Sequence, residues 1–182
     1  MNDERLVRIS RYLAKHLRHQ PERIGLTLAP DGWVPIEVLL AACQRHNFPL
    51  TRGELDEVVA GNNKRRYAYD PTGTLIRASQ GHSVPVDLHL PPVTPPDVLY
   101  HGTARQSLES IMREGLHKRA RHHVHLSADR ATAHAVGARH GPPVVLVVDA
   151  GVMHQDGYTF YRSDNGVWLV DHVPPTYVHV LT

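Results

Sequence analysis

A proline-rich segment in the middle of the chain constrains its fold more than any other feature. Between residues 84 and 97 the sequence places five prolines: Pro85, Pro91, Pro92, Pro95 and Pro96. Each proline fixes a backbone dihedral and lacks an amide hydrogen, so such a run does not continue a helix or a central strand. We therefore expect a stiff, extended connector that divides the 182 residues into two lobes, 1–90 and 91–182.

Composition places the chain among globular proteins. Hydrophobic residues make up 41%, which is enough for a packed core. The N-terminus is charged, and no run approaches the about 20 apolar residues of a membrane span, so we expect a soluble cytoplasmic protein without membrane contact. The single cysteine, Cys43, allows no internal disulfide. With 20 Lys+Arg against 18 Asp+Glu, the charge permits local contact with nucleic acid but does not demand it.

The first lobe has the pattern of three helices and a hairpin. Leu6, Ile9, Leu13 and Leu17 recur at helical spacing, and they predict a helix over residues 3–19 that Pro21 ends. A second helix is expected from Pro35, and a third after Thr51, which forms a capping box with Glu54. Residues 66–69 and 74–77 flank a turn and predict a hairpin.

This order of elements is the outline of a winged helix, an architecture that often binds nucleic acid. A small α+β domain without nucleic acid fits the pattern equally well, and winged helices also bind proteins. The topology by itself does not decide between these interpretations.

The second lobe has mostly strand patterns. Apolar or alternating runs predict strands at 98–100, 123–126, 144–148, 158–162, 167–170 and 177–181, with short helices at 107–113 and 131–139. Asn165-Gly166 is a strong hairpin signal. The sequence therefore predicts an α+β protein whose second lobe is a mostly antiparallel sheet.

Two clusters combine arginine with histidine. Arg18-His19 ends the first helix, and Arg121-His122-His123-Val124-His125 precedes and enters a strand. A guanidinium group suits phosphate, and imidazole donates or carries a proton near neutral pH. The alternative is a basic surface, since cations at a helix C-terminus are also favoured by its dipole.

Three further segments carry polar groups at expected turns or strand ends. Lys64 and Arg66 lie two residues apart at the start of the hairpin, so in an extended strand their side chains would point to the same face. Gln80-Gly81-His82-Ser83 ends the first lobe. Tyr100-His101-Gly102-Thr103 leaves a buried strand, and its glycine permits close approach of a ligand to the backbone. These segments suit a nucleotide, although polar turns of this kind are common.

A metal site is a weaker interpretation of the histidines. His123 and His125 share one strand face, but neither a cysteine nor a Glu-x-x-His motif lies near them. We therefore expect no metal. The sequence also lacks a glycine-rich phosphate loop, so a Rossmann or P-loop mechanism has no support.

Together, these segments resemble the NAD-dependent RNA 2′-phosphotransferase family over nearly the whole chain. Any one of them is weak, but seven in order are specific: Leu17-Arg18-His19-Gln20-Pro21, Gly32-Trp33-Val34, Lys64-Arg65-Arg66-Tyr67, Ile76-Arg77-Ala78-Ser79-Gln80-Gly81-His82-Ser83, Leu99-Tyr100-His101-Gly102-Thr103, Arg121-His122-His123-Val124-His125-Leu126 and Asn165-Gly166-Val167-Trp168-Leu169.

The resemblance implies a winged-helix RNA-binding lobe followed by an NAD-binding lobe of the ADP-ribosyltransferase fold. It also implies a two-step reaction with NAD⁺ as co-substrate and no metal. The RNA 2′-phosphate first attacks the nicotinamide ribose, which gives a 2′-phospho-ADP-ribosylated RNA. The ribose 2″-hydroxyl then attacks phosphorus and releases 2′-hydroxyl RNA with ADP-ribose 1″,2″-cyclic phosphate.

The resemblance also implies roles for individual residues. The catalytic set maps onto Arg18, His19, Arg66 and Arg121, because motif register favours these over the neighbours Arg65 and Arg119. NAD⁺ binding maps onto His101, Gly102, Thr103, His125 and Val167. Substrate binding maps onto Lys64, Gln80, His82 and Ser83.

The chain departs from the pattern of its relatives at two of these positions. Val167 stands where many ADP-ribosyltransferases carry a glutamate, and Tyr67 stands where the family often has Phe. The valine fits a substrate that is already charged, because a phosphate nucleophile needs no glutamate to activate it. The tyrosine keeps an aromatic ring at its position, so it puts little in doubt.

Two alternatives remain at this point. The first is an ADP-ribosyltransferase that acts on nucleic-acid phosphate ends or on protein, and the second is an RNA-binding module without activity. The resemblance implies a 2′-phosphorylated RNA as the partner, either tRNA-like or of another kind. A single substrate site formed by two lobes needs no second subunit, so we expect a monomer.

Overall fold

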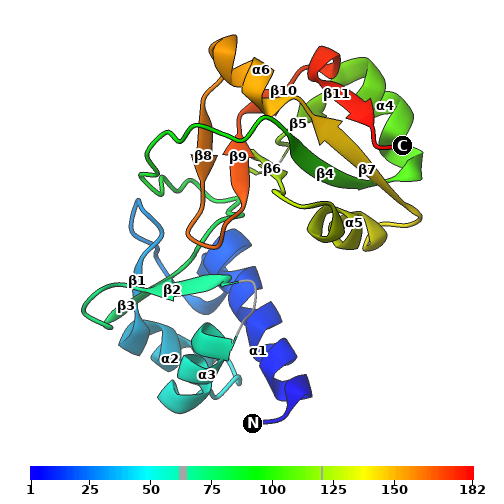
Figure 1. Ribbon diagram of the computed structural model, residues 1–182. Coiled ribbons are helices and arrows are strands. Elements are labelled where there is room, and N and C mark those ends of the chain that lie inside the picture. Colours follow the sequence, from blue (N-terminus) through cyan, green and yellow to red (C-terminus); the bar gives the residue numbers. More distant parts are fainter. Residues whose placement is uncertain (62–64, 120) are drawn as a thin grey trace. The chain divides into compact units, whose positions relative to one another are not determined.

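The computed structural model describes residues 1–61, 65–119 and 121–182. The chain divides into two compact units, Met1–His89 and Leu90–Thr182, and each has its own hydrophobic core. The fold is mixed α+β, and the strands pair in several small antiparallel sheets (Figure 1). This confirms the predicted α+β class and the antiparallel pairing.

The described residues of unit 1 form three α-helices and one three-stranded sheet with strand order β1-β3-β2. The elements are α1 (Asp3–Ala14), a π-helix (Lys15–His19), a 3₁₀ helix (Pro21–Ile24), β1 (Val34–Pro35), α2 (Ile36–Arg45), α3 (Arg52–Gly61), β2 (Tyr67–Tyr69) and β3 (Leu75–Ala78). The sequence does not predict strand β1, because two residues are too few to show the alternation of polar and apolar side chains that marks a strand.

The capping box predicted before α3 is present. The backbone amide of Glu54 donates to the Thr51 hydroxyl at 3.1 Å, and the Thr51 amide donates to the Glu54 carboxylate at 3.1 Å. This reciprocal pair satisfies two amides at the helix N-terminus. Arg5 of α1 also donates to the Glu54 carboxylate at 3.2 Å, so the cap of α3 is tied to α1.

In the described part of unit 2, the strands form two three-stranded sheets and one two-stranded ladder. Their strand orders are β11-β7-β4, β6-β9-β8 and β10-β5. The elements are β4 (Leu99–Ala104), α4 (Leu108–Glu114), β5 (Leu116–His117), β6 (Val124–Leu126), α5 (Arg130–Ala138), β7 (Pro143–Val148), α6 (Ala150–Gln155), β8 (Phe160–Arg162), β9 (Trp168–Val170), β10 (His172–Val173) and β11 (Val178–Val180).

One expectation for unit 2 is wrong, and one element is missed. The strand predicted at 98–100 continues to Ala104, so His101 lies inside β4 and not at its end. Helix α6 is not predicted, because its six residues are too few to show a helical period. The central position of β7 and the hairpin at Asn165-Gly166 are confirmed, and Gly166 has the positive φ of 82° that this turn requires.

Helix α5 lies directly against β4 and β7 (Figure 1). A Cβ atom added to Gly102 of β4 would lie 1.6 Å from the carbonyl oxygen of Ala133 in α5. A Cβ atom at Gly137 of α5 would lie 2.8 Å from the Thr103 carbonyl oxygen. Both glycines are therefore required for the two backbones to approach this closely.

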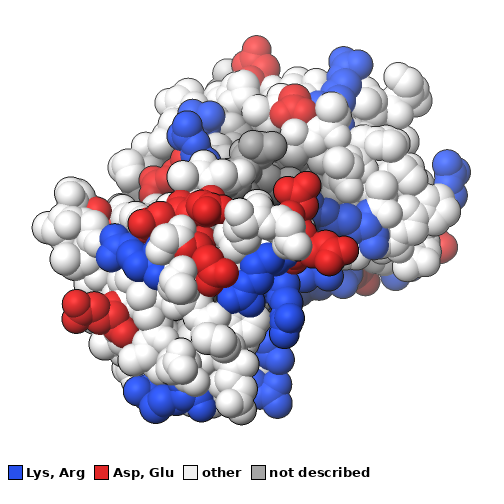
Figure 2. Space-filling model, turned by 90° about the horizontal axis from the view of Figure 1, so that it is seen from below, with Lys and Arg blue, Asp and Glu red and all other residues white. Residues whose placement is uncertain are grey.

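Among the described residues, no helix is long and apolar enough to cross a membrane. On the face shown in Figure 2, acidic and basic side chains are mixed, in line with the formal net charge of +2. Long-range attraction of a polyanion by a uniformly basic face has no support in this view, so anion binding must be argued from particular residues.

We predict that Gly102→Ala lowers the free energy of unfolding by about 3 kcal/mol or more, because the new methyl group collides with backbone that cannot rotate away. Urea unfolding measures the effect. The control is Gly53→Ala in α3, where the nearest heavy atom to an added Cβ is 4.0 Å away. That variant should be neutral or stabilised by up to about 1 kcal/mol, and a neutral Gly102→Ala would contradict the packing described here.

Candidate functional site

Arg18 and His19 lie in a π-helical turn, and this corrects the prediction of one continuous α-helix over residues 3–19. Helix α1 ends at Ala14, and Lys15–His19 form a π-helix. The amide of Gln20 donates to the Lys15 carbonyl at 2.9 Å, which is the five-residue spacing of this helix. Short π-helical turns are rare and are frequent at functional sites. The wide turn sets the directions in which Arg18 and His19 leave the backbone.

The loop after β3 is bound to this π-helix. The amide of Ser83 donates to the Arg18 carbonyl at 2.9 Å, and the Ser83 hydroxyl contacts His19 Nδ1 at 2.9 Å. Three of the predicted site residues, Arg18, His19 and Ser83, are thus brought together in unit 1. Gln80 and His82 of the same loop are buried, with 9% and 2% of their surfaces exposed. Their predicted contact with substrate stays a prediction.

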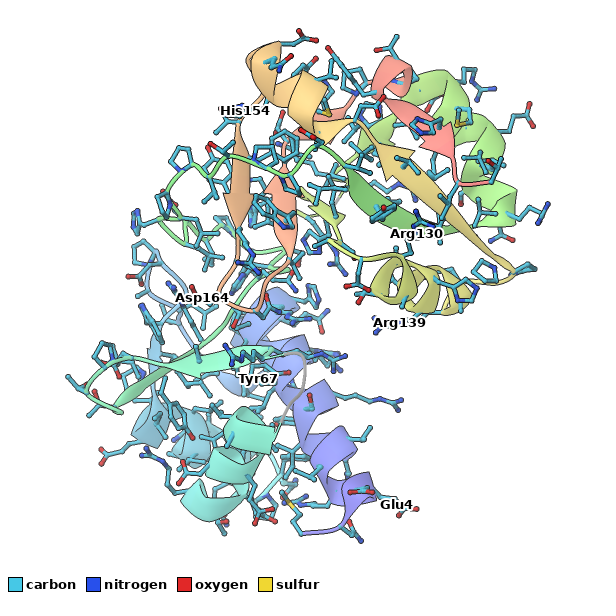
Figure 3. All side chains as sticks on the ribbon, viewed as in Figure 1. Glu4, Tyr67, Arg130, Arg139, His154 and Asp164 are labelled. Carbon is cyan, nitrogen blue, oxygen red and sulfur yellow. The ribbon has the colours of Figure 1, made fainter. Side chains whose placement is uncertain are left out.

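Tyr67 connects β2 with α1, and Figure 3 labels it where the two elements meet. Its hydroxyl donates to the Ser10 carbonyl at 2.5 Å in the interior of unit 1. Burial raises the pKa of Tyr67, while the hydrogen bond at Ser10 and the positive charges of Arg18 and Arg66 oppose the rise.

Arg18 and Arg66 therefore both act electrostatically on one phenol, although 48 residues separate them in sequence. Guanidinium groups bind phosphate well, so both arginines stay candidates for a phosphate site. Lys64, the remaining predicted residue of this segment, lies outside the described residues.

In unit 2, a chain of two hydrogen bonds joins His101, His125 and Arg121. The Nδ1–H of His101 donates to the His125 carbonyl at 3.0 Å, which ties β4 to β6. Arg121 Nη1 donates to His125 Nδ1 at 2.9 Å. A guanidinium group only donates, so the Nδ1 atom of His125 accepts and its proton lies on Nε2. His125 thus contacts His101 through its carbonyl oxygen and Arg121 through its ring.

Burial lowers the pKa of His101, and its hydrogen bond to the His125 carbonyl opposes that shift. The ring is therefore neutral near pH 7, with its proton on Nδ1 because a carbonyl oxygen only accepts. The Nε2 atom then carries a lone pair. This atom accepts a hydrogen bond from a hydroxyl group, such as those of a ribose.

Desolvation lowers the pKa of Arg121, and repulsion from Arg139 lowers it further. Arg121 is nevertheless exposed as a residue and stays charged, because the ordinary pKa of arginine lies far above neutrality. Arg139, which follows the last residue of α5, is not anticipated by the sequence analysis. The effect of Arg139 on Arg121 can be recognised only in the folded protein, where the two arginines lie within electrostatic range of each other.

Backbone contacts determine where the remaining residues predicted to bind NAD⁺ lie. Gly102 and Thr103 are buried, and the face of Gly102 that would carry a side chain is filled by α5. Val167 is half-buried immediately before β9, and its amide donates to the Ser163 hydroxyl at 3.1 Å. Ser163 is 4% exposed, and the sequence analysis does not identify it.

The histidines of 122–125 do not form a metal centre in the part of the chain that the structure describes. There, no group of three or more His, Cys, Asp or Glu side chains is arranged to hold a metal ion. His123 instead packs against Tyr161, with ring centroids 5.4 Å apart, and burial lowers its pKa.

Comparison with known proteins decides the family. The family described as "RNA 2'-phosphotransferase, Tpt1 / KptA family" matches residues 4–172. A probable RNA 2′-phosphotransferase of Nostoc punctiforme is 62% identical over 178 residues, which cover 98% of each chain. The chain belongs to the RNA 2′-phosphotransferase family. Proteins of the same description from Streptomyces coelicolor and Flavobacterium johnsoniae are 61% and 48% identical over 178 residues, again covering 97% or more of each chain.

Family membership confirms the resemblance drawn from the seven sequence segments. The protein is an RNA 2′-phosphotransferase and therefore an enzyme, which excludes the interpretation as a binding module without activity. The matched region includes all of the residues assigned above to the catalytic set. Their individual roles are not decided by the match.

We predict that His101 titrates below the ordinary histidine pKa of about 6.5. Its folded-state pKa is lowered, so its contribution to stability is present above that value and is lost as the pH falls. Imidazole NMR resonances recorded from pH 8 to pH 5 measure the shift against the ordinary histidine value. Titration of His101 at or above that value would contradict the neutral ring.

Proposed function

We propose that the protein transfers an internal 2′-phosphate from RNA to NAD⁺ in two steps. A phosphate oxygen first displaces nicotinamide at the anomeric carbon of NAD⁺, which gives a 2′-phospho-ADP-ribosylated RNA. The ribose 2″-hydroxyl then attacks phosphorus, and RNA leaves with a free 2′-hydroxyl. The second product is ADP-ribose 1″,2″-cyclic phosphate.

We assign unit 1 as a winged-helix RNA-binding domain and unit 2 as an NAD-binding domain of the ADP-ribosyltransferase type. Three α-helices followed by the β2–β3 hairpin support the first assignment. The small antiparallel sheets of unit 2, with His101 and His125 on neighbouring strands, support the second. We propose that the protein is a monomer, and analytical ultracentrifugation would test this.

The single observation that carries this proposal is the hydrogen-bonded chain His101–His125–Arg121. Neutral His101 presents a lone pair that suits a ribose hydroxyl, while Arg121 presents donors that suit phosphate. Because both contact His125, an NAD⁺ ribose held at His101 lies near an arginine that binds the attacking phosphate. Thr103 and the backbone of Gly102 are assigned to the same nucleotide.

Positioning accounts for most of the first step. The nucleophile is already ionised, so the protein must hold it in line with the anomeric carbon instead of removing a proton. Val167 fits this requirement, because a carboxylate at its position would repel a phosphate dianion. An apolar residue leaves the anion free to approach.

Charge stabilisation accounts for the second step. Negative charge grows on the phosphorus oxygens as the ribose hydroxyl attacks, and arginine forks stabilise that charge. We assign Arg18, Arg66 and Arg121 to the phosphate oxygens. His19, oriented by its contact with Ser83 at 2.9 Å, donates a hydrogen bond to one of them. Gln80, His82 and Lys64 are assigned to binding of the RNA.

The test is a product analysis with NAD⁺ and an RNA oligonucleotide that carries one internal 2′-phosphate, without added metal. We expect dephosphorylated RNA, nicotinamide and ADP-ribose cyclic phosphate in equal amounts. A stable ADP-ribosylated RNA as the final product of the wild-type protein would support an ADP-ribosyltransferase instead. Transfer of ADP-ribose to added protein, without loss of the 2′-phosphate, would also contradict the proposal.

We predict that Arg18→Ala and Arg121→Ala each lower the overall rate by about 100-fold or more, because each removes a charged donor from the transferred phosphate. Accumulation of ADP-ribosylated RNA locates the loss in the second step. Arg113→Ala on the surface of α4, where the guanidinium pairs with neighbouring Glu114 at 3.5 Å, is the matched control. Wild-type rates in Arg18→Ala or Arg121→Ala would refute the site assignment.

A further inference from the structure

Ser79 follows the last residue of β3 and is 3% exposed. Its hydroxyl donates to the Arg65 carbonyl at 2.8 Å, and its amide donates to the Arg66 carbonyl, also at 2.8 Å. One buried residue thus holds two consecutive peptide carbonyls immediately before β2. None of the roles assigned above uses Ser79.

The backbone that Ser79 holds has an unusual conformation. Arg65 has a φ of +43°, in the left-handed region that residues with a side chain rarely adopt. Such a conformation persists when surrounding contacts impose it. The hydroxyl of Ser79 supplies a contact of this kind, because its acceptor is the carbonyl of Arg65 itself.

The conformation at Arg65 determines where the side chain of Arg66 leaves the backbone. On its other side, Arg66 is followed by Tyr67, which is anchored to the Ser10 carbonyl of α1. The start of β2 is therefore fixed from two directions. Both Arg66 and Arg18 act electrostatically on the Tyr67 phenol, and a rotation at residue 65 would change the direction in which the Arg66 side chain leaves the backbone.

We propose that Ser79 is a positioning residue for Arg66. Its buried hydroxyl holds Arg65 in the left-handed conformation and thereby directs the Arg66 guanidinium to the same phosphate as Arg18. This inference rests on the proposed function, in which that anion is the 2′-phosphate of RNA. It adds a residue that touches no substrate and acts only through an arginine.

The variant Ser79→Ala removes the hydroxyl and leaves the amide. The chain offers a matched control, Ser10→Ala, because Ser10 is also buried in unit 1 and its hydroxyl has no hydrogen-bond partner among the described residues. Thermal melting establishes that both variants fold. Fluorescence anisotropy then measures affinity for two labelled RNA oligonucleotides, which are identical except that one carries an internal 2′-phosphate.

We expect Ser79→Ala to weaken binding of the phosphorylated oligonucleotide by about 10-fold, because a misdirected arginine loses its charge-assisted hydrogen bonds. Binding of the unphosphorylated oligonucleotide should not change. Ser10→Ala should bind both as the wild-type protein does. In an Arg66→Ala background, Ser79→Ala should cause no further loss, because the residue through which it acts is absent.

Two results would overturn the inference. Equal weakening of both oligonucleotides, or the same loss with and without Arg66, would show that Ser79 acts on structure in general. An unchanged affinity in Ser79→Ala would show that its hydroxyl has no such role. A wild-type protein that fails to distinguish the oligonucleotides and fails to release the 2′-phosphate with NAD⁺ would instead refute the proposed function.

Discussion

The close backbone approach between α5 and β4 at Gly102 determines how the candidate site of unit 2 is built. A side chain at Gly102 would collide with the Ala133 carbonyl, so only glycine lets the helix rest on the strand. The residues on either side, His101 and Thr103, are thereby held against β6 and α5. The glycine that looked suited to ligand approach in the sequence is required first for packing, and the ligand site depends on that packing.

We attribute the chemistry of the proposed site to its arginines. In unit 1, Arg18 and Arg66 both act electrostatically on the Tyr67 phenol, and in unit 2 burial, with a further contribution from Arg139, lowers the pKa of Arg121. Like charges that are held together raise the free energy of the unliganded protein, and a bound phosphate lowers it. In the proposed arrangement, neutral hydrogen bonds that Tyr67, Ser79 and His101 donate to backbone carbonyls fix the backbone beside these side chains.

Much of the local structure could be predicted, and the failures have physical causes. The helices from Ile36 and Arg52, the capping box and the hairpin at Asn165-Gly166 follow from short-range signals, which the structure retains. The π-helical turn could not be predicted, because its apolar spacing at Leu13 and Leu17 is also that of an α-helix. Strand β4 was predicted too short because His101 and Thr103 are polar, and their burial depends on α5 and β6.

The sequence by itself determined the family, the α+β class and which arginines and histidines are candidates for catalysis, because these follow from residue types at fixed spacings. It did not determine which residues hold those candidates in place. Ser79 and Ser163 form hydrogen bonds with backbone carbonyl and amide groups, which nearly every residue possesses, so no pattern of side chains in the sequence predicts these contacts. Only the tertiary structure brings those backbone groups to the serines, because the contacts form between segments that the chain must first fold together.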